Sequence, residues 1–296
     1  SSDVHQDDHD IYEKIKHKKQ CYIILNKSDK QQKSYDISQL PKTTYPYFHT
    51  SLKTDSSLSD IKKKLSQDFI ETLSEVNLDL ATGEFITIVG PSGCGKSTLL
   101  RIIAGLISST EGSVNKPDTS MGAFVFQDAA LLPWRNVQRN AELLMELEDG
   151  FSKQERISRV SSALQQVGLS GFEKSYPHQL SGGMKMRLSL ARALVLRPEY
   201  LLLDEPLSAV DELTRELLQE EIHALWKEEK FTAILVTHNV TEAVFLSNKV
   251  VVMSPRPGEI VHVVDVPFKK RDQLLRSKAQ FTKLVSDISG KLREWK

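Results

Sequence analysis

The feature that most constrains the fold of this sequence is a glycine-rich turn between an apolar run and a helical run. Residues 90–97 read Gly-Pro-Ser-Gly-Cys-Gly-Lys-Ser and fit the phosphate-loop pattern G-x-x-x-x-G-K-[ST]. The run Glu84–Val89 before the turn predicts a buried strand, and residues 98–103 after it predict a helix. Backbone N–H groups at such a helix start converge on phosphate oxygens. The segment therefore predicts a nucleotide site rather than a chance glycine-rich turn.

We expect the phosphates to contact a continuous set of residues: Gly90, Pro91, Ser92, Gly93, Cys94, Gly95, Lys96, Ser97 and Thr98. Lys96 adds a positive charge near the β and γ phosphates, and the Ser97 hydroxyl is a ligand for Mg²⁺. We expect Cys94 to be a packed small residue rather than a reactive thiol.

A second apolar run ends in two carboxylates. Residues 201–203 are all Leu, and Asp204, Glu205 and Pro206 follow them. The carboxyl end of a strand in an open α/β sheet faces the crevice where ligands bind. Alone, this pattern would be typical of a strand that leads into a solvated turn. Beside the phosphate loop, it predicts that Asp204 holds Mg²⁺ through water and that Glu205 is the general base for the attacking water.

A second glycine-containing helix start lies at Leu180–Met184. Ser181 is a typical N-cap residue, and Gly182 and Gly183 expose backbone donors, so these three residues could bind a γ-phosphate. The first loop already binds the phosphates of its own nucleotide. The second helix start therefore makes most sense if it closes over a nucleotide held by another subunit.

The order of apolar and helical segments predicts an α/β protein. From about Ser57, short apolar runs alternate with helical stretches, as in a mainly parallel sheet covered by helices. We divide the chain into a polar extension (1–55), the main domain (56–266, with a helical subdomain at about 128–180) and a basic helical tail (267–296). The extension is expected to be disordered or loosely packed; a docking or regulatory arm is the alternative.

Composition gives weaker indications. Lys plus Arg equals Asp plus Glu at 39 each, which gives no reason to expect nucleic acid as a partner. The two cysteines, Cys21 and Cys94, favour a reducing compartment over a disulfide-stabilised fold. No apolar run approaches the roughly 20 residues of a membrane-spanning helix, and the start does not have the pattern of a secretory signal.

Together, the phosphate loop, the Leu180–Met184 segment and the carboxylates after it resemble the ABC (ATP-binding cassette) ATPases over about residues 57–265. The resemblance implies the ABC-type P-loop NTPase fold: a mainly parallel sheet core, a small antiparallel β part and an inserted α-helical subdomain. It also implies a head-to-tail homodimer, with two ATP molecules between the phosphate loop of one subunit and Ser181–Gly183 of the other.

Three further positions fall where this family pattern expects them. Gln127, in Phe126-Gln127-Asp128, would reach Mg²⁺ and the attacking water. The segment Leu207–Asp211 would cross the dimer interface and bring Asp211 to the nucleotide, with Val210 where Leu is usual. His238, after Val236-Thr237, would contact the γ-phosphate; by itself it would be read as a polar surface residue.

Two features depart from the family pattern. Phe69 is the best match for the aromatic residue that stacks on adenine, but its connection to Leu73 is short, and a packed core phenylalanine is the alternative. Lys185-Met186-Arg187 stands where Arg-Gln-Arg is common. That change should leave the phosphate contacts intact while altering the contacts around them.

One cassette with no membrane segment resembles the separate ATPase subunit of an importer. The stretches 131–137, 175–179, 211–215 and 253–258 resemble the nitrate, sulfonate, taurine and bicarbonate branch. The implied partners are a second copy, a permease and, indirectly, a solute-binding protein, at the cytoplasmic face of the membrane. Residues around Trp134 would form a docking groove for the permease, with core packing of Leu131 and Leu132 as the alternative. Import of a metal complex, peptide or lipid, and action on nucleic acid or ribosomes, stay open.

Overall fold

The computed structural model describes residues 23–26, 47–50, 72–116, 121–148 and 150–294. They belong to two compact units, Ser1–Ile70 and Glu71–Lys296. In the first unit, strands β1 (Ile23–Asn26) and β2 (Tyr47–Thr50) pair in parallel, with Ile23 opposite Tyr47. The predicted domain boundary between residues 55 and 56 lies outside the described residues.

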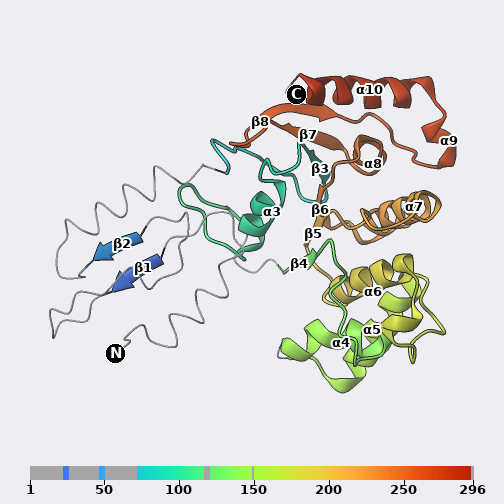
Figure 1. Cartoon of the computed structure of the whole chain (residues 1–296). Coiled ribbons are helices and arrows are strands. Elements are labelled where there is room, and N and C mark those ends of the chain that lie inside the picture. The colour runs from blue at the N-terminus through green and yellow to red at the C-terminus, as the bar shows by residue number, and fades with distance from the viewer. Residues whose placement is uncertain (1–22, 27–46, 51–71, 117–120, 149, 295–296) are drawn as a thin grey trace, which may run out of the picture. The chain divides into compact units, whose positions relative to one another are not determined.

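The second unit is built on one six-stranded sheet (Figure 1). Its strands are β3 (Phe85–Val89), β4 (Gly122–Val125), β5 (Tyr200–Asp204), β6 (Thr232–Val236), β7 (Lys249–Met253) and β8 (Ile260–Asp265). They lie in the order β4-β5-β6-β3-β7-β8, and all neighbours are parallel except β7 and β8. The mainly parallel sheet with a small antiparallel part is thus confirmed.

Alternate side chains of the strands enter two hydrophobic cores. In β5, Leu201 and Leu203 belong to the larger core and Leu202 to the smaller one, as the two-residue period of a strand requires. Helix α3 (Lys96–Ala104) packs in the smaller core, while α7 (Glu212–Glu229) and α8 (Val240–Leu246) pack in the larger one. Figure 1 shows α3 on one side of the sheet and α7 and α8 on the other. Burial on both faces explains why the runs are almost continuously apolar.

The segment between β4 and β5 is helical. It contains α4 (Val137–Leu147), α5 (Lys153–Gln166), the short 3₁₀ helix η2 (Pro177–Gln179) and α6 (Gly182–Leu194). The starts of α4 and α5 are fixed by side-chain caps, since Asn136 accepts from Arg139 N and Ser152 forms a capping box with Glu155. Helices α4, α5 and α6 contact one another beyond the β4 edge of the sheet (Figure 1). The predicted helical subdomain is therefore present.

The C-terminal segment folds back onto the unit. The predicted helical tail (267–296) contains two helices, because α9 (Gln273–Arg276) ends before α10 (Ala279–Arg293) begins. Phe281 and Ile288 of α10 are buried, and α10 contacts α8 and β7. This helix therefore covers part of the sheet face already occupied by α8.

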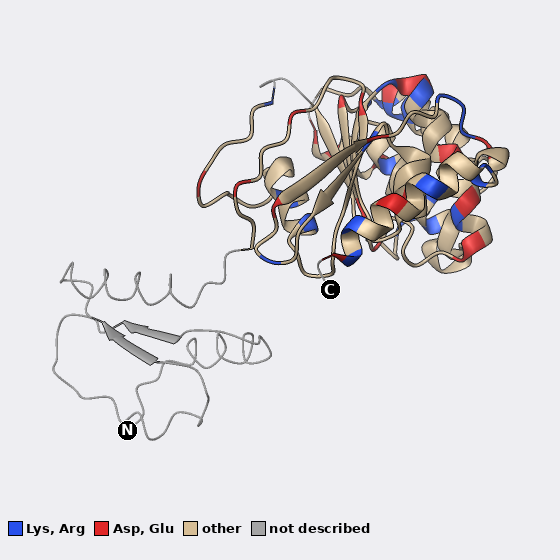
Figure 2. Cartoon of the chain, turned by 90° about the horizontal axis from the view of Figure 1, so that it is seen from above, with Lys and Arg blue, Asp and Glu red and all other residues tan. Residues whose placement is uncertain are grey.

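Charges of both signs are mixed over the helices of the second unit, whereas the strands carry few (Figure 2). Among the described residues, no helix combines the length and the apolar character needed to cross a bilayer.

Candidate active site

The phosphate loop connects β3 to α3 in the predicted strand-to-helix arrangement. Gly95 caps α3 with a φ of 108°, and a Cβ added there would lie 2.6 Å from Leu73 Cδ2. Only glycine tolerates both the left-handed backbone and the close approach. The loop is thereby held against Leu73, a residue that precedes β3.

Lys96 is buried, and its ammonium group stays within the loop. Its Nζ donates to Gly90 O and to Pro91 O, at 2.9 Å each, and lies 3.9 Å from Cys94 Sγ. A buried ammonium needs such acceptors. Cys94 is buried as well, as predicted for a packed residue.

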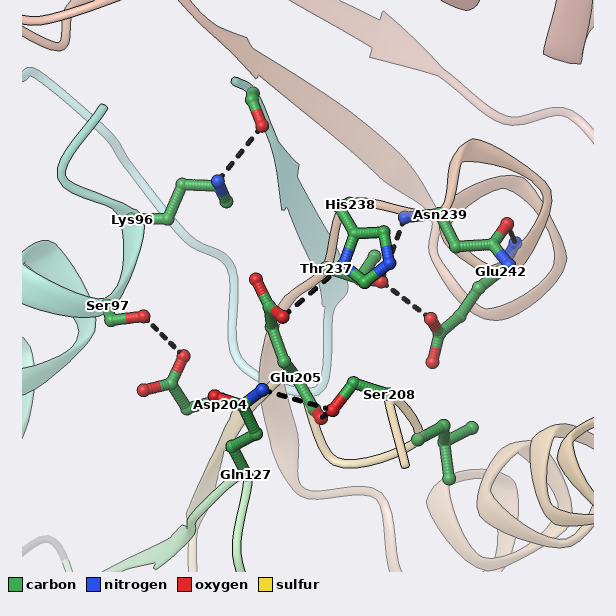
Figure 3. A network of polar contacts seen from close by, with 12 residues as sticks. Lys96, Ser97, Gln127, Asp204, Glu205, Ser208, Thr237, His238, Asn239 and Glu242 are labelled. Carbon is green, nitrogen blue, oxygen red and sulfur yellow. Dashed lines mark hydrogen bonds and ion pairs between the residues drawn. The ribbon is translucent and has the colours of Figure 1, made fainter. Parts of the chain in front are cut away.

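Ser97 and Asp204 come together from α3 and the end of β5. The Ser97 hydroxyl donates to Asp204 Oδ1 at 2.6 Å (Figure 3). Arg101 Nη2 lies 3.9 Å from Asp204 Oδ2. A hydroxyl and a carboxylate oxygen in contact are the donor types that Mg²⁺ prefers, and this ion usually takes only one or two protein ligands beside phosphate and water. Among the described residues, no group of three His, Cys, Asp or Glu side chains could hold a metal ion by itself.

Glu205 follows Asp204 in a left-handed backbone conformation, with a φ of 47°. Its N–H donates to Val236 O at 2.9 Å, and its carbonyl accepts from the Ser208 hydroxyl, also at 2.9 Å. Its carboxylate lies 3.3 Å from His238 Nδ1, a distance at which a protonated Nδ1 donates to it (Figure 3). The end of β5 and the loop after β6 thus present the two side chains to each other.

Gln127 reaches the same region from the loop after β4. Its Nε2 lies 3.3 Å from Ser208 Oγ, and this hydroxyl in turn donates to Glu205 O. Lys96, Ser97, Gln127, Asp204, Glu205 and His238 therefore meet at the carboxyl ends of β3, β4, β5 and β6 (Figure 3).

The remaining predicted residues form a second group. Ser181 caps α6 by accepting from Met184 N, and Asp211 caps α7 by accepting from Thr214 N. Hydrogen bonds from Thr214 lower the pKa of Asp211. A Cβ added at Gly183 would lie 2.7 Å from Thr214 Cγ2, and one at Gly182 would lie 4.0 Å from Ala209 O. The starts of α6 and α7 are therefore adjacent.

Within one chain these two groups do not meet. In Figure 1, α6 and α3 lie at different places along the sheet, on opposite sides of it. Phe69, the predicted adenine-stacking residue, lies outside the described residues.

Three polar side chains at the site were not predicted. Arg101 lies one helical turn after Ser97, so helix periodicity could have suggested that it faces Asp204. Arg215 donates to Leu207 O and Val210 O and so holds the 207–211 segment. Glu242, in α8, accepts from the Thr237 hydroxyl. No local sequence pattern indicates the last two contacts.

Comparison with known proteins decides the family. The family model for the ABC transporter matches residues 73–208. The aliphatic sulfonates import ATP-binding protein of Bacillus thuringiensis is 43% identical over 218 residues, which are 71% of this chain and 85% of that protein. The chain belongs to the ABC transporter ATP-binding proteins. The matched residues include the phosphate loop, the Ser181–Gly183 segment and Asp204 and Glu205.

A second related protein and a solved structure are also similar to this chain. The second aliphatic sulfonates import ATP-binding protein of Pseudomonas syringae pv. tomato is 47% identical over 215 residues, 70% of this chain and 89% of that protein. The dimeric structure of a post-hydrolysis state of an ATP-binding cassette bound to ADP and Pi has a TM-score of 0.58 and 32% identity, covering 67% of this chain and 91% of the other. Membership of this family makes the chain an ATP-binding and ATP-hydrolysing protein.

Proposed function

We propose that this ABC ATPase powers a separate membrane permease that imports a small anion. The observation that carries the proposal is the pair of phosphate-binding helix starts, at α3 and α6, that do not meet within one chain. Two copies arranged head to tail would bring Ser181, Gly182 and Gly183 of one copy to the nucleotide on the phosphate loop of the other. The dimeric cassette structure described above supports this arrangement.

The oxygen-bearing side chains at the site fit a bound Mg²⁺. Ser97 and Asp204 would hold it, directly or through water, with Gln127 next to them. When bound, Mg²⁺ neutralises charge on the β and γ phosphates of ATP. Lys96 would exchange the carbonyls of Gly90 and Pro91 for phosphate oxygens, because a charged acceptor gives the stronger hydrogen bond.

Glu205 is proposed as the general base. Its carboxylate would accept a proton from a water whose oxygen bonds to the γ-phosphorus, while the bond from that phosphorus to the bridging oxygen breaks and ADP leaves. His238, at 3.3 Å, would orient the carboxylate and contact the γ-phosphate. Ser208 would hold the backbone carbonyl of Glu205 by its hydrogen bond. Gln127, which contacts Ser208, would position the attacking water.

The hydrolysis roles are tested with Glu205→Gln and Lys96→Ala, and with the exposed Glu228→Gln as a matched control. We expect Glu205→Gln to bind ATP but to lose at least about 100-fold in kcat, as removal of a general base does. Lys96→Ala should lose nucleotide binding, and Glu228→Gln should behave as wild type. Full turnover by Glu205→Gln would disprove the assignment of the base.

The permease contact is proposed at the segment after Gln127. Leu131 packs against the larger core, so the alternative of core packing holds for that residue. Trp134 is 72% exposed, and Leu147 at the end of α4 is 74% exposed. Large exposed apolar side chains are typical of partner sites. With such a contact, the chain would be a peripheral protein at the cytoplasmic face of the membrane.

Aliphatic sulfonates are the first substrate to test, because relatives with 43% and 47% identity are named as sulfonate import proteins. A deletion strain of the native host should fail to grow on ethanesulfonate as sole sulfur source, grow normally on sulfate, and recover with the wild-type gene but not with the Glu205→Gln gene. Normal growth on ethanesulfonate, with loss of uptake of nitrate, taurine or bicarbonate, would replace the substrate and keep the importer. ATPase stimulation by ribosomes or DNA, with no co-purifying permease, would overturn the transport proposal.

A further inference from the structure

We infer that Thr237 and Glu242 are positioning residues for ATP hydrolysis: their buried hydrogen bond fixes the backbone on both sides of His238. The inference rests on the proposed function, since it acts through the pair formed by His238 and Glu205. Neither residue contacts the reacting atoms in this arrangement. Both act on His238 through the backbone of residues 237 and 239.

His238 depends on its backbone for its position. Its side chain is 66% exposed, and the only contact that the described part of the chain gives it at hydrogen-bond distance is the one to Glu205 at 3.3 Å. An exposed ring with one polar contact has little packing to hold it. The orientation of the imidazole ring toward Glu205 therefore depends on the backbone of residues 237 and 239.

Three hydrogen bonds close a ring around that backbone (Figure 3). The Thr237 hydroxyl donates to Glu242 Oε2 at 2.6 Å, Asn239 N donates to Thr237 Oγ1 at 3.1 Å, and Glu242 N donates to Asn239 Oδ1 at 3.1 Å. Thr237 N also donates to Ile88 O of β3 at 3.2 Å, two residues before the phosphate loop. The residue before His238 is thus tied to the sheet and the residue after it to α8.

The chemistry of a hydroxyl makes Glu242 necessary to this ring. Thr237 has one hydroxyl proton, and it must point at Glu242 for an oxygen lone pair to face Asn239 N–H. Thr237 and Glu242 are only 2% and 3% exposed, so water does not replace either partner. Loss of the carboxylate acceptor would leave the hydroxyl free to turn and loosen the hydrogen bond to residue 239.

Burial of Glu242 is costly, which argues against an incidental contact. Its Oε1 is buried without a hydrogen-bond partner among the described residues. Burial raises its pKa to about 7, against the hydrogen bond from Thr237 and the nearby charges of Arg215 and His238, while the charge of Glu205 raises it further. A buried carboxyl with one unsatisfied oxygen destabilises a fold, so its presence points to a role other than stability. The hydrogen bond to Thr237, the residue before His238, supplies that role.

The test uses the full chain and measures kcat and KM for ATP together with ATP binding. Thr237→Val removes both hydrogen bonds of the hydroxyl at nearly constant volume. We expect kcat to fall about tenfold or more with KM and ATP affinity within twofold of wild type. Thr237→Ser, which restores the hydroxyl, should recover most of kcat. Glu242→Gln, whose amide oxygen can still accept, should also keep most of it.

Thr87→Val is the matched control. Thr87 is a fully buried threonine of β3, and its hydroxyl has no hydrogen-bond partner among the described residues. Its variant should keep kcat and KM, which separates loss of a buried hydroxyl in general from loss of this one. Thermal unfolding of every variant checks that each one is folded at the assay temperature.

A spectroscopic measurement tests the same inference without turnover. In ¹⁵N-edited spectra of the ATP-free chain, the ring nitrogens of His238 should shift in Thr237→Val and return in Thr237→Ser. Wild-type kcat and unshifted His238 signals in Thr237→Val would overturn the inference. Loss of turnover in Glu205→Gln, measured in the same assay, would still support the proposed function. If Glu205→Gln were fully active, the assignment of Glu205 as the general base, on which this inference rests, would fail.

Discussion

Two buried ionisable side chains, one in α7 and one in α8, have pKa values shifted in opposite directions. Glu242 is held toward its neutral form by burial, and so is His223, which is 4% exposed and lies against Trp226 and Phe245. For an acid the neutral form carries the proton, and for a base it does not. The folding stability of the protein therefore responds to pH differently through each residue.

For Glu242, burial raises the folded-state pKa to about 7, above the ordinary value of 4.5. Between these values the folded state binds more protons than the unfolded state, so stability falls as pH rises. We expect the difference in free energy of unfolding between Glu242→Gln and wild type to grow in favour of the variant from pH 5 to pH 8, by up to roughly 3 kcal/mol. Urea unfolding at several pH values measures it; a difference that does not change with pH would contradict the prediction.

For His223, burial lowers the pKa to about 4, and the charges of Arg271 and Lys227 add to this effect. The folded state binds fewer protons than the unfolded state below the unfolded pKa of 6.5, so the wild-type chain loses stability as pH falls from about 6.5 to 4. His223→Phe should not show this loss. The expected difference in free energy of unfolding between pH 7 and pH 4 is up to roughly 3 kcal/mol. Thermal unfolding of both proteins at pH 7 and pH 4 measures it. An equal loss of stability in wild type and His223→Phe between these pH values would refute the prediction.

At the scale of elements, the sequence predicted the strands and the site loops better than their arrangement. The predicted strand Glu84–Val89 corresponds to β3. Its side chains point to the two faces of the sheet and so enter the two hydrophobic cores. The position of β3 between β6 and β7 could not be predicted, because it depends on pairing between runs far apart in the chain. For the same reason Glu242 was missed: as the third residue of a capped helix it is typical of a solvated surface, and only packing of α8 buries it.

The link between α9 and the core provides a prediction at this scale. Arg276 stacks on Phe245 at 3.8 Å, donates to Gln219 at 2.8 Å and to Glu220 at 3.2 Å, and its side chain is only 13% exposed. Arg276→Ala should lower the free energy of unfolding by about 1–3 kcal/mol. The exposed Arg293→Ala of α10 should change it by less than about 0.5 kcal/mol. Equal effects of the two variants would show that α9 is not held by this side chain.

At the scale of the whole molecule, the residues predicted to bind nucleotide are divided between two places. One group surrounds Lys96, and the other lies where α6 and α7 begin. A sequence pattern could predict both groups, because each contains a helix start that is recognisable from a short local motif. That they do not meet within a chain was expected from the family resemblance, and the geometry of one chain agrees with it (Figure 1).

The separation of these two groups within one chain predicts that ATP controls the association of two copies of the chain. In the Glu205→Gln background, ATP with Mg²⁺ should convert monomers to dimers, as measured by light scattering after size exclusion. Adding Ser181→Arg should abolish the dimer, because a bulky side chain would occupy the space of the partner's γ-phosphate. ATP binding to the phosphate loop should be kept. A dimer of unchanged stability in the double variant would place the interface elsewhere.

The left-handed backbone at Glu205 has an evolutionary consequence. An L-residue at a φ of 47° costs about 1 kcal/mol relative to glycine, so Glu205→Gly is expected to make the chain more stable while abolishing hydrolysis. Random mutation screened only for thermal tolerance would therefore tend to discard the carboxylate. Its retention must be enforced by selection on turnover alone, and a directed-evolution campaign on this protein would need to couple every stability screen to an activity screen.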